Sequence, residues 1–468
     1  MAFLIVLASL CFLMYVAYRG YSVILFAPIA AMGAVLVTDP TLVAPVFTGL
    51  FMDKMVVFVK LYFPIFLLGA IFGKTIELAG FAKSIVAAVI KTVGRERAIF
   101  SIVLVCCLLT YGGVSVFVVV FAVYPFAAEM FKAGGIPKRL IPGTIALGSF
   151  TITMDAFPGT PQIQNVIPTT FFKTTIYAAP WLGVIGGLLI VGAGLAYLEW
   201  MRRRAQAAGE GYGTTNLVNE PEPFDETREK LPNPFIAILP LVMVAVSNYA
   251  FTEWIPQFYG TSHQFIPSVI GKAAPVVQPI ASVRAIWAVE GALLVGIAMI
   301  FLFAFKPVMA RFIDGSKSAI AGALLASINT ASEYGYGSVI ASLTGFLVVA
   351  EGLKVIPNPL IHEAITVTTL AGITGSASGG LGIALSAMSS TFIANAQAAG
   401  IPLEVMHRVA SMASGGMDSL PHNGAVITLL MVTGLTHRQS YKDIFAITIL
   451  KTIGVFVVIG IYYATGLV

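Results

Sequence analysis

Residues 154–158 read MDAFP and residues 417–421 read MDSLP, so the pattern Met-Asp-x-(Phe/Leu)-Pro occurs twice. A second marker precedes each copy, AGGIP at 133–137 and AAGIP at 398–402. The Asp lies 20 residues after the last marker glycine in the first copy and 18 residues after it in the second. Two markers in the same order at matching spacing indicate an internal repeat. The chain is therefore predicted to consist of two related halves.

Each marker follows an apolar segment that is interrupted in its middle by small residues. Residues 98–130 contain TYGGVS at 110–115, and residues 361–398 contain GSASGG at 375–380. These two interruptions superpose when the marker glycines are aligned. Tyr111 lies 24 residues before Gly135, and Ser376 lies 24 residues before Gly400. We therefore expect a re-entrant hairpin in each half, entering and leaving on one face.

The composition places the chain in a membrane. Of its 468 residues, 58% are hydrophobic and 10% are charged, against roughly half and a quarter in soluble proteins. Long apolar runs recur near the ~20 residues that cross the bilayer core. These runs do not alternate as the strands of a transmembrane barrel do. The predicted fold class is an all-α polytopic membrane protein.

Five full spans are expected in each half. The predicted spans are 2–18, 22–38, 56–80, 138–171 and 175–199 in the first half, and 235–250, 285–305, 318–350, 403–435 and 443–466 in the second.

A polar segment at 201–234 divides the halves, because it holds 11 of the 49 charged residues (27 basic and 22 acidic). The predicted domains are a first repeat at 1–200 with its hairpin at 98–130 and a broken helix at 138–171, a linker at 201–234, and a second repeat at 235–468 with its hairpin at 361–398 and a broken helix at 403–435.

The distribution of basic residues predicts the orientation. With both hairpins re-entrant, most loop bases fall on one side, which the positive-inside rule makes cytoplasmic. Five crossings per half is an odd number, so the second half must be inserted upside down relative to the first. The bases assigned to the cytoplasmic side, together with the linker, are Arg19, Lys83, Lys91, Arg95, Arg97, Lys132, Lys138, Arg139, Arg202, Arg203, Arg204, Lys306, Arg311, Lys317, Arg438 and Lys442.

Four breaks at membrane depth predict a binding site, at 110–115, 154–162, 375–380 and 417–424. Unpaired backbone groups are tolerated there only where protein or water satisfies them, and half-helix N-termini attract anions. None of the four breaks contains Lys or Arg, so a substrate carboxylate would be held by backbone N–H groups and hydroxyls. The alternative is that the small residues only let helices pack closely. The candidate substrate-binding residues are Thr110, Gly112, Gly113, Ser115, Asp155, Gly159, Thr160, Gln162, Asn165, Ser376, Ser378, Gly379, Gly380, Asp418, His422 and Asn423.

Asp155 and Asp418 occupy equivalent places in the two repeats, and an ionisable residue inside the membrane is a functional candidate. Each Asp could carry a proton or hold a cation; alternatively, each caps the half-helix that follows its break. His422 could relay a proton or be a structural donor. Glu333, in NTASEYGYGS at 329–338, is expected to mark a further break and either to bind a cation or to fix helix packing, which we favour. The candidate ion-coupling residues are Asp155, Asp418, His422 and Glu333. His407 and Arg408 are expected to pair helices or lie at the interface.

Other function classes lack their motifs. Gly335-Tyr336-Gly337 is not preceded by the Thr-Val of a potassium filter, and neither G-x-S-x-G nor H-E-x-x-H occurs. Three cysteines within apolar runs do not form a disulfide or metal pattern. The net charge of +5 mostly reflects bases in loops, so no nucleic-acid partner is expected. We expect no enzyme activity, cofactor or bound metal, and a passive anion channel is the rival function.

Four stretches resemble the gluconate permease (GntP) family of the ion transporter superfamily. They are FGKTIELAGFAKS at 72–84, YGGVSVFVVVFAVYPFA at 111–127, FPGTPQIQN at 157–165 and SGGMDSLPHNGAVITLL at 414–430. The resemblance covers nearly the whole chain. It implies two inverted repeats, a scaffold that dimerises, and an elevator-like movement of the hairpin-bearing transport domain in a bacterial inner membrane.

The resemblance also implies a substrate class. Characterised family members take up sugar acids and other hydroxycarboxylates, typically with protons. The gluconate transporters carry a His-rich first break and a His-Val-Asn-Asp-Ser second segment, whereas this chain reads TMDAFPGTPQIQN and MDSLPHNGAV. The chain is more similar to the branch of 3-hydroxybutyrate permeases, which predicts a short hydroxycarboxylate as substrate. Proton symport is expected, with sodium as the second candidate ion and gluconate or another sugar acid as the alternative substrate.

Overall fold

The computed structural model describes residues 2–19, 21–94, 97–114, 116–213, 219–220, 231–265, 276–346, 356–421 and 423–468. Within these residues the protein is helical apart from one antiparallel strand pair, β1 (Ser262–Phe265) and β2 (Val276–Pro279). Six of the described helical segments are long and apolar enough to cross a membrane. The prediction of an all-α polytopic membrane protein is confirmed.

The described residues of the first half form ten numbered α-helices. They are α1 (Ala2–Tyr18), α2 (Val23–Thr38), the short α3 (Val43–Pro45), α4 (Met52–Leu78), α5 (Phe81–Val93), α6 (Ala98–Tyr111), α7 (Val116–Ala133), α8 (Leu140–Ser149), α9 (Ile163–Phe172) and α10 (Pro180–Ala207). Three further turns are η1 (Pro40–Leu42), the π-helical η2 (Val46–Phe51) and the π-helical η4 (Ile152–Ala156).

The second half contains seven described α-helices. They are α11 (Pro234–Tyr259), α12 (Arg284–Ser342), α14 (Pro359–Thr374), α15 (Ala377–Ala398), α16 (Leu403–Ser414), α17 (Gly424–Thr433) and α18 (His437–Thr465). A 3-10 turn, η6 (Ile280–Ser282), joins β2 to α12.

Both broken helices stop where the sequence carries proline and glycine. After α8, Thr151 leaves the helical region, and Pro158 and Pro161 lie in the stretch before α9. Proline lacks the backbone N–H of a helix, and Gly159 adopts a positive φ of 82°. After α16, the corresponding interruption runs from Gly415 to the residue before α17. The two Met-Asp motifs therefore lie outside regular α-helix.

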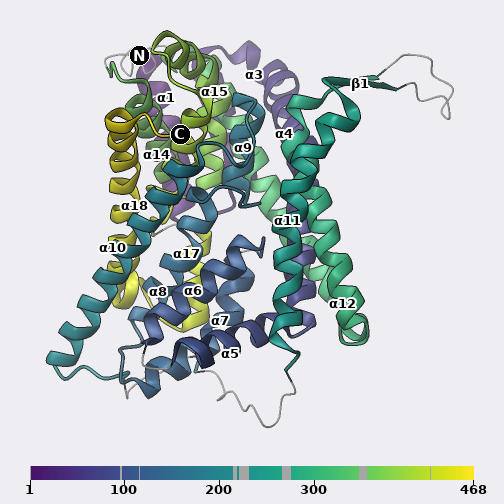
Figure 1. Ribbon diagram of the computed structural model, residues 1–468. Coiled ribbons are helices and arrows are strands. Elements are labelled where there is room, and N and C mark those ends of the chain that lie inside the picture. The colour runs from purple at the N-terminus through teal and green to yellow at the C-terminus, as the bar shows by residue number, and fades with distance from the viewer. Residues whose placement is uncertain are drawn as a thin grey trace.

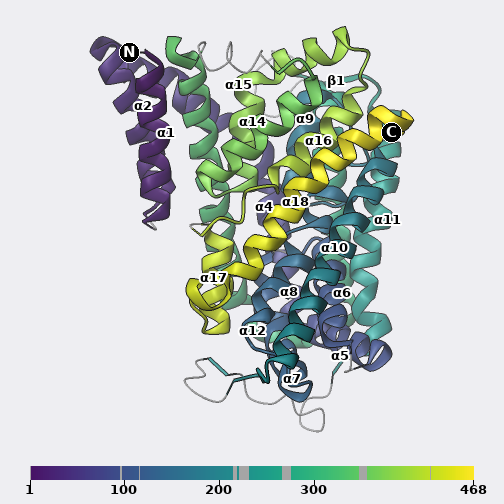
Figure 2. The ribbon, with the colours of Figure 1, turned by 90° about the vertical axis from the view of Figure 1, so that its left-hand side faces the viewer.

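The two helix pairs approach from opposite ends of the molecule. Figures 1 and 2 show α6 and α7 in the lower half and α14 and α15 in the upper half. The pair α6–α7 packs against α8 of its own half and α17 of the other half. The pair α14–α15 packs against α16 of its own half and α9 of the other. The helix pair of each half thus contacts the half-helix that follows the break in the other half, α17 in one case and α9 in the other.

Helix α12 contains two of the predicted spans. Its two parts meet at a kink at Ala304, three residues before Pro307, which is where the predicted span 285–305 ends, while the expected loop at 306–317 is helical. The segment 329–338, which was expected to be a break, is continuous helix. Its glycines allow close packing instead, because a Cβ on Gly335 would lie 2.9 Å from the Phe51 carbonyl oxygen and one on Gly337 would lie 2.8 Å from Ile383. The final part of the predicted span, 347–350, lies outside the described residues.

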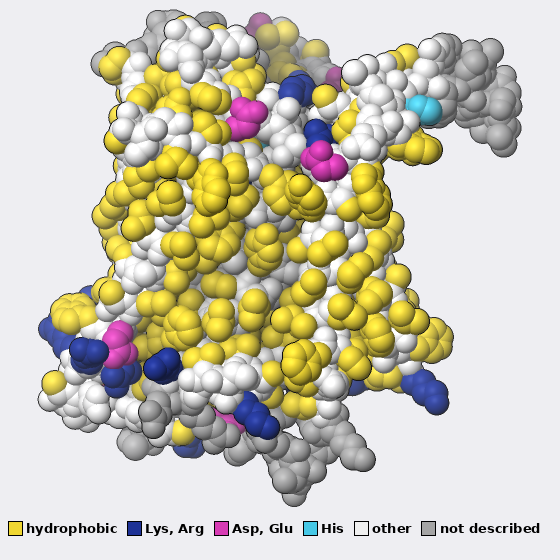
Figure 3. All heavy atoms as spheres, viewed as in Figure 1, with side chains coloured by type: hydrophobic (Ala, Val, Ile, Leu, Met, Phe, Trp, Pro, Cys, Tyr) yellow, Lys and Arg dark blue, Asp and Glu magenta, His cyan; other side chains and the backbone are white. Residues whose placement is uncertain are grey.

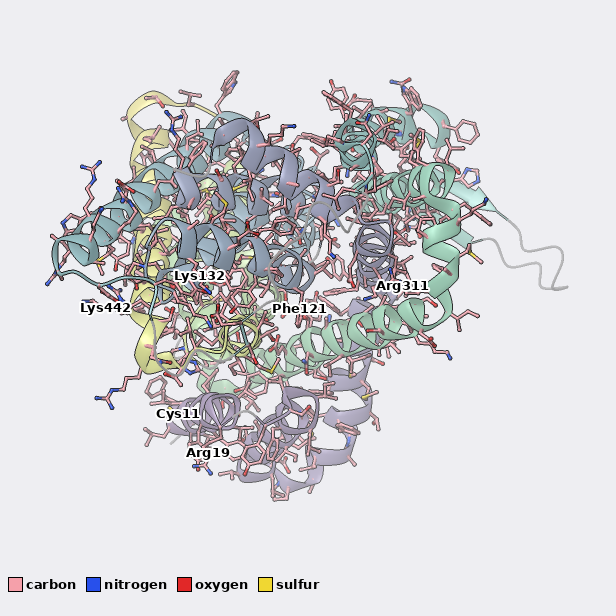
Figure 4. The ribbon with its side chains drawn as sticks, turned by 90° about the horizontal axis from the view of Figure 1, so that it is seen from below. Cys11, Arg19, Phe121, Lys132, Arg311 and Lys442 are labelled. Atoms are coloured by element: carbon pink, nitrogen blue, oxygen red, sulfur yellow. The ribbon has the colours of Figure 1, made fainter. Side chains whose placement is uncertain are left out.

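Charged side chains gather at the lower end of the molecule. In Figure 3 a broad hydrophobic band covers the middle, and most of the Lys and Arg side chains visible on this face lie below it. Figure 4 looks onto this lower end and labels Lys132, Arg311 and Lys442. One predicted cytoplasmic base, Arg19, follows the end of α1, and Figure 2 shows α1 beside the upper half of the molecule, with both of its ends well above the lower end.

The described parts of the linker are tied to this lower end. Arg139, just before α8, pairs with Glu210 at 2.7 Å, and Lys138 pairs with Glu220 at 2.7 Å. The Tyr124 hydroxyl of α7 donates to the Asn219 carbonyl oxygen at 2.8 Å. The linker therefore lies on the same side as the charged ends of α7 and α8.

Candidate functional site

A buried cluster of three ionisable groups lies where the two broken helices meet α18. The Lys451 Nζ atom is 2.9 Å from Asp418 Oδ1 and 4.0 Å from Asp155 Oδ2. Lys451, Asp155 and Asp418 are 2%, 2% and 4% exposed. The two Met-Asp motifs, one from each half, therefore converge on a single lysine. We call Asp155, Lys451 and Asp418 the ion cluster.

The two carboxylates of the ion cluster have different surroundings. Asp418 Oδ1 accepts hydrogen bonds from Lys451 Nζ and, at 2.8 Å, from the Ser419 hydroxyl. Asp155 Oδ2 makes no hydrogen bond with the described residues. With both carboxylates ionised and the lysine protonated, the cluster carries a net charge of −1. Asp155 thus has the fewer direct partners within the cluster, and the buried Arg408 guanidinium lies beside it as a further cation.

The alternative that the aspartates cap the following half-helices is wrong. Helix α17 is capped by Asn423, whose Oδ1 accepts from the Val426 amide at 2.9 Å. Helix α9 begins after Gln162 without a side-chain cap. Neither Asp155 nor Asp418 accepts a hydrogen bond from these helix termini, so the carboxylates are available to the ion cluster.

Arg408 of α16 holds the first-half break in place. Its side chain is wholly buried and donates to the Ala178 carbonyl oxygen at 2.8 Å and to Asn165 Oδ1 at 3.1 Å. Longer bonds of 3.4 Å reach the Asp155 and Ile176 carbonyl oxygens. Gly183 of α10 leaves room for the guanidinium, because a Cβ there would lie 3.0 Å from Arg408 Nε. The buried arginine thus joins the halves beside Asp155.

His407, the neighbour of Arg408, contributes to the same contact. Its ring nitrogens lie 2.6 Å from the Thr174 hydroxyl and 3.2 Å from Asn165 Oδ1. Both residues therefore have the helix-pairing role expected for them, with many more polar contacts than an interfacial position would give.

Gln162 and Asn423 perform equivalent tasks in the two halves. Gln162 Nε2 donates to the Thr110 carbonyl oxygen at 2.8 Å, and Asn423 Nδ2 donates to the Gly375 carbonyl oxygen at 2.8 Å. Each amide thereby ties the broken helix of its half to the hairpin tip of the same half. In this conformation these donors are engaged by the protein itself, which is a role that the repeat alignment did not anticipate.

The other first-half candidates surround this tie. The Thr160 hydroxyl donates to the Thr153 carbonyl oxygen at 2.5 Å, and Asn165 Nδ2 donates to the Thr160 and Ile176 carbonyl oxygens. The Thr110 hydroxyl is buried and makes no hydrogen bond with the described residues. Gly159 lies beside the Tyr177 and Tyr111 rings.

The glycines of the first hairpin tip pack against α11 and α12, which belong to the second half of the chain. A Cβ on Gly112 would lie 2.4 Å from the Leu241 side chain of α11, and one on Gly113 would lie 3.3 Å from Leu293 of α12. No hydrogen bond joins residues 110–114 to 375–380. Each tip is instead tied to its own broken helix. Two candidates, Ser115 and His422, lie outside the described residues.

The second hairpin tip lies against α12. The Ser376 hydroxyl accepts from the Gly379 amide at 3.0 Å, and the Ser378 hydroxyl is 3.2 Å from that of Thr330. Gly380 packs onto the backbone of α14, because a Cβ there would lie 2.2 Å from the Ala371 Cα. Glu333 of α12 is buried beside Gly379. This tip therefore brings together Ser376, Ser378, Gly379, Gly380 and Glu333.

Sequence reasoning missed Lys451 and the polar contacts of Arg408. The four breaks indeed lack Lys and Arg, but both cations enter from other segments, α18 and the middle of α16. The expectation of a site without any Lys or Arg nearby is therefore wrong. One signal was present: Lys451 is an isolated charge within the apolar run predicted for the last span, and such charges are usually functional or paired.

Gly415 is the residue that admits the Asp155 carboxylate. A Cβ at this position would lie 1.8 Å from Asp155 Oδ2 and 3.1 Å from Lys451 Cε. Because Gly415 has an ordinary helical φ of −81°, alanine there meets only a steric obstacle. We expect Gly415→Ala to lower stability by about 1–3 kcal/mol, the usual cost of overpacking, and to slow uptake more than tenfold (about 1.4 kcal/mol).

Gly192→Ala in α10 is the matched control, since no atom lies within 4 Å of a Cβ built there. Thermal unfolding midpoints and initial uptake rates in proteoliposomes compare the two variants. Equal behaviour of both would show that the Asp155 carboxylate does not need the space beside Gly415.

A cavity of about 390 Å³ opens elsewhere, between α6 and α10. Its lining includes Arg97, Phe100, Glu199 and Arg202, and no residue of the four breaks. It is therefore separate from the ion cluster.

No family model matches the chain. A protein of Bacillus subtilis (strain 168) named "Uncharacterized transporter YxjC" is 57% identical over 474 residues, and the match covers 100% of both chains. The chain belongs to this transporter family. It is accordingly a multi-pass membrane transporter, and the ion cluster is its candidate functional site. Among solved structures, that of the Alcanivorax borkumensis YdaH transporter, whose topology is described as unusual, matches with a TM-score of 0.48 and 12% identity, covering 90% of this chain and 88% of the other.

Proposed function

We propose that this YxjC-family protein is a secondary transporter that imports a small hydroxycarboxylate of the 3-hydroxybutyrate type together with protons. The observation that carries the proposal is the position of Lys451 between Asp155 and Asp418. One carboxylate comes from each repeat, so a change in the charge of the cluster acts on both halves at once. Alternating access requires this kind of link between the halves.

The geometry of the ion cluster favours a proton over sodium as the coupling ion. The Lys451 ammonium lies where a cation between the two carboxylates would bind. Asp155 Oδ2 has no hydrogen-bond partner in the described structure, so it is the oxygen of the cluster that can take up a proton. The buried Arg408 guanidinium beside Asp155 offsets the remaining negative charge, so the preference rests on the positions of these groups. Sodium remains the second candidate ion.

The substrate class rests on the anion-binding chemistry of the breaks and on the resemblance to gluconate permeases. The N-termini of α15 and α17 begin inside the molecule at the second tip and second break, and helix N-termini favour carboxylates. We propose that the substrate lies between the hairpin tips and the broken helices. Its movement would follow an elevator mechanism in a homodimer in the bacterial inner membrane.

Uptake driven by an imposed gradient tests this proposal. Purified protein in proteoliposomes should accumulate labelled 3-hydroxybutyrate when the outside is more acidic than the inside, and accumulation should collapse when a protonophore is added. A sodium gradient at equal pH separates the second candidate ion. Accumulation that ignores both gradients would refute ion-coupled transport.

Two further measurements separate the rival functions. A carrier exchanges labelled for unlabelled substrate without net flux, whereas a passive anion channel equilibrates substrate and conducts current without counterflow. An excess of unlabelled gluconate should leave 3-hydroxybutyrate uptake nearly unchanged. Strong inhibition by gluconate would instead assign the protein to sugar acids.

A further inference from the structure

The N-terminus of α15 lies at the second hairpin tip. The helix has 22 residues, and its N-cap Ser376 accepts the Gly379 amide at 3.0 Å. The first amides of a helix have no acceptor within the helix and carry partial positive charge. Asn423 fixes the preceding Gly375 carbonyl oxygen, which holds the start of α15 in position.

A carboxylate of the protein itself lies against this helix terminus. Glu333 projects from α12 and is 3% exposed, and its Oε2 atom has no hydrogen-bond partner in the described structure. A Cβ built on Gly379 would lie 1.7 Å from Glu333 Oε2 and 2.4 Å from its Cδ. The carboxylate therefore lies against the first turn of α15 at residue 379, where a side chain larger than that of glycine would collide with it.

No described charged side chain offsets Glu333. The segments α2, α9, α15 and η2, which pack on α12, contain no charged residue. Asp53, Lys54 and Lys60 of α4 are exposed, away from the buried Glu333.

The other charged groups on the two helices that pack most extensively on α12 are paired elsewhere. Lys74 of α4 pairs with Glu77 at 2.8 Å, within the same helix. Glu253 of α11 pairs with Arg284 at 3.0 Å, at the first residue of α12.

The titratable groups near this part of α12 are phenols. Tyr334 lies next to Glu333 in sequence, and Tyr62 of α4 is linked to Tyr334 through the ring of Phe58, with centroid distances of 4.7 Å and 5.5 Å. The remaining polar neighbours at the tip are hydroxyls: Thr330 contacts Ser378 at 3.2 Å, and Thr374 donates to the Ser376 carbonyl oxygen at 3.2 Å. The Ser376 hydroxyl, which caps α15, lies within hydrogen-bonding reach of the Glu333 carboxylate. This hydroxyl and the partial positive charge of the helix terminus are thus the groups that favour a negative charge on Glu333.

We propose that the Glu333 carboxylate occupies the position in which the substrate carboxylate binds, so that substrate enters only when Glu333 is protonated or displaced. This inference rests on the proposed function and deepens it, because it names the anion subsite and a second proton-linked residue. Two ionised carboxylates cannot share one helix terminus without a second cation, and α15 supplies none. Glu333 is thus a tethered competitor of the substrate.

The test measures binding of 3-hydroxybutyrate, and of acetate as a minimal carboxylate, to the purified full-length protein by calorimetry over a pH series. For wild-type protein the affinity should fall as pH rises, since ionised Glu333 competes. Glu333→Gln keeps the size of the side chain and removes the charge. It should bind at least tenfold more tightly at alkaline pH, and the slope of log Kd against pH should decrease by about one, which corresponds to one proton fewer linked to binding.

Glu290→Gln is the matched control because Glu290 lies on the same helix and is partly exposed. It should leave the slope unchanged. Glu333→Asp provides a second variant that retains the charge but shortens the side chain by one methylene. It should bind more tightly than wild type at alkaline pH, and it keeps the proposal testable if the Gln variant does not fold.

The outcomes separate the two proposals. Binding by wild type with an unaltered pH slope in Glu333→Gln, or weaker binding by both Glu333 variants, overturns the role of Glu333 and leaves the transport proposal standing. Absence of binding of either carboxylate to wild type at every pH overturns the proposed function and this inference together. A reduced slope with tighter binding in the Gln variant supports both.

Discussion

Replacing Lys451 with methionine is expected to reduce gradient-driven uptake to below about one hundredth of the wild-type rate. The methionine fills similar space but leaves Asp155 and Asp418 without the ammonium that lies 2.9 Å from one and 4.0 Å from the other. Removing one partner of a buried ion pair costs about 3–5 kcal/mol, which is more than a hundredfold in an equilibrium or rate. Initial uptake rates in proteoliposomes, normalised to the amount of inserted protein, provide the measurement.

Lys442→Met is the control for the lysine prediction, because Lys442 is on the same helix and exposed at its lower end (Figure 4). It should retain near wild-type uptake. Because groups in one network couple, Asp418→Asn combined with Lys451→Met should be more stable than Lys451→Met alone. A Lys451→Met protein with more than half the wild-type rate would contradict the importance of the ion cluster.

Replacing Asp418 with asparagine should weaken the response of uptake to the pH gradient and make uptake at least about tenfold slower. The amide cannot neutralise Lys451, so the ammonium should move to Asp155, only 4.0 Å away. The Asp155 carboxylate is then paired with the ammonium, which disfavours its protonation. Uptake measured with and without an imposed pH gradient shows whether coupling is lost.

Asp314→Asn controls for the loss of an aspartate, since the Asp314 side chain is 94% exposed. The control should keep both the rate and the response to the gradient. Equal behaviour of the Asp418 and Asp314 variants would remove Asp418 from the mechanism.

The fold followed from local signals in the sequence. Proline and glycine disfavour a continuous helix, so the Met-Asp-x-(Phe/Leu)-Pro motifs and the Gly/Ser tips predicted where helices would end. A single proline does not suffice, since Pro28 and Pro64 lie inside α2 and α4. Helix α12 escaped this reasoning because the glycines of its second part pack against Phe51 and Ile383. Glycine alone is ambiguous between a break and a close contact. Only the neighbouring helix decides between the two, and sequence does not reveal that neighbour.

The site was predictable only in part. Asp155 and Asp418 were identifiable because the repeat places them at equivalent positions, but Lys451 lies 33 residues from Asp418 and has no counterpart in the repeat pattern. Gln162 and Asn423 were recognised as polar groups at the breaks, yet the task that they share, holding a tip carbonyl oxygen, depends on a fold contact. The spacing of residues within one segment cannot predict a contact that a side chain such as Lys451 makes with another segment.

The number of protons moved with each substrate molecule tests the central claim most directly. Labelled 3-hydroxybutyrate uptake and the change in internal pH can be recorded in the same proteoliposomes for wild type and for Asp155→Asn. We predict that the variant still exchanges substrate but carries about one proton fewer per molecule, because the unpaired carboxylate of the ion cluster is gone. An unchanged proton-to-substrate ratio in the variant would contradict the account.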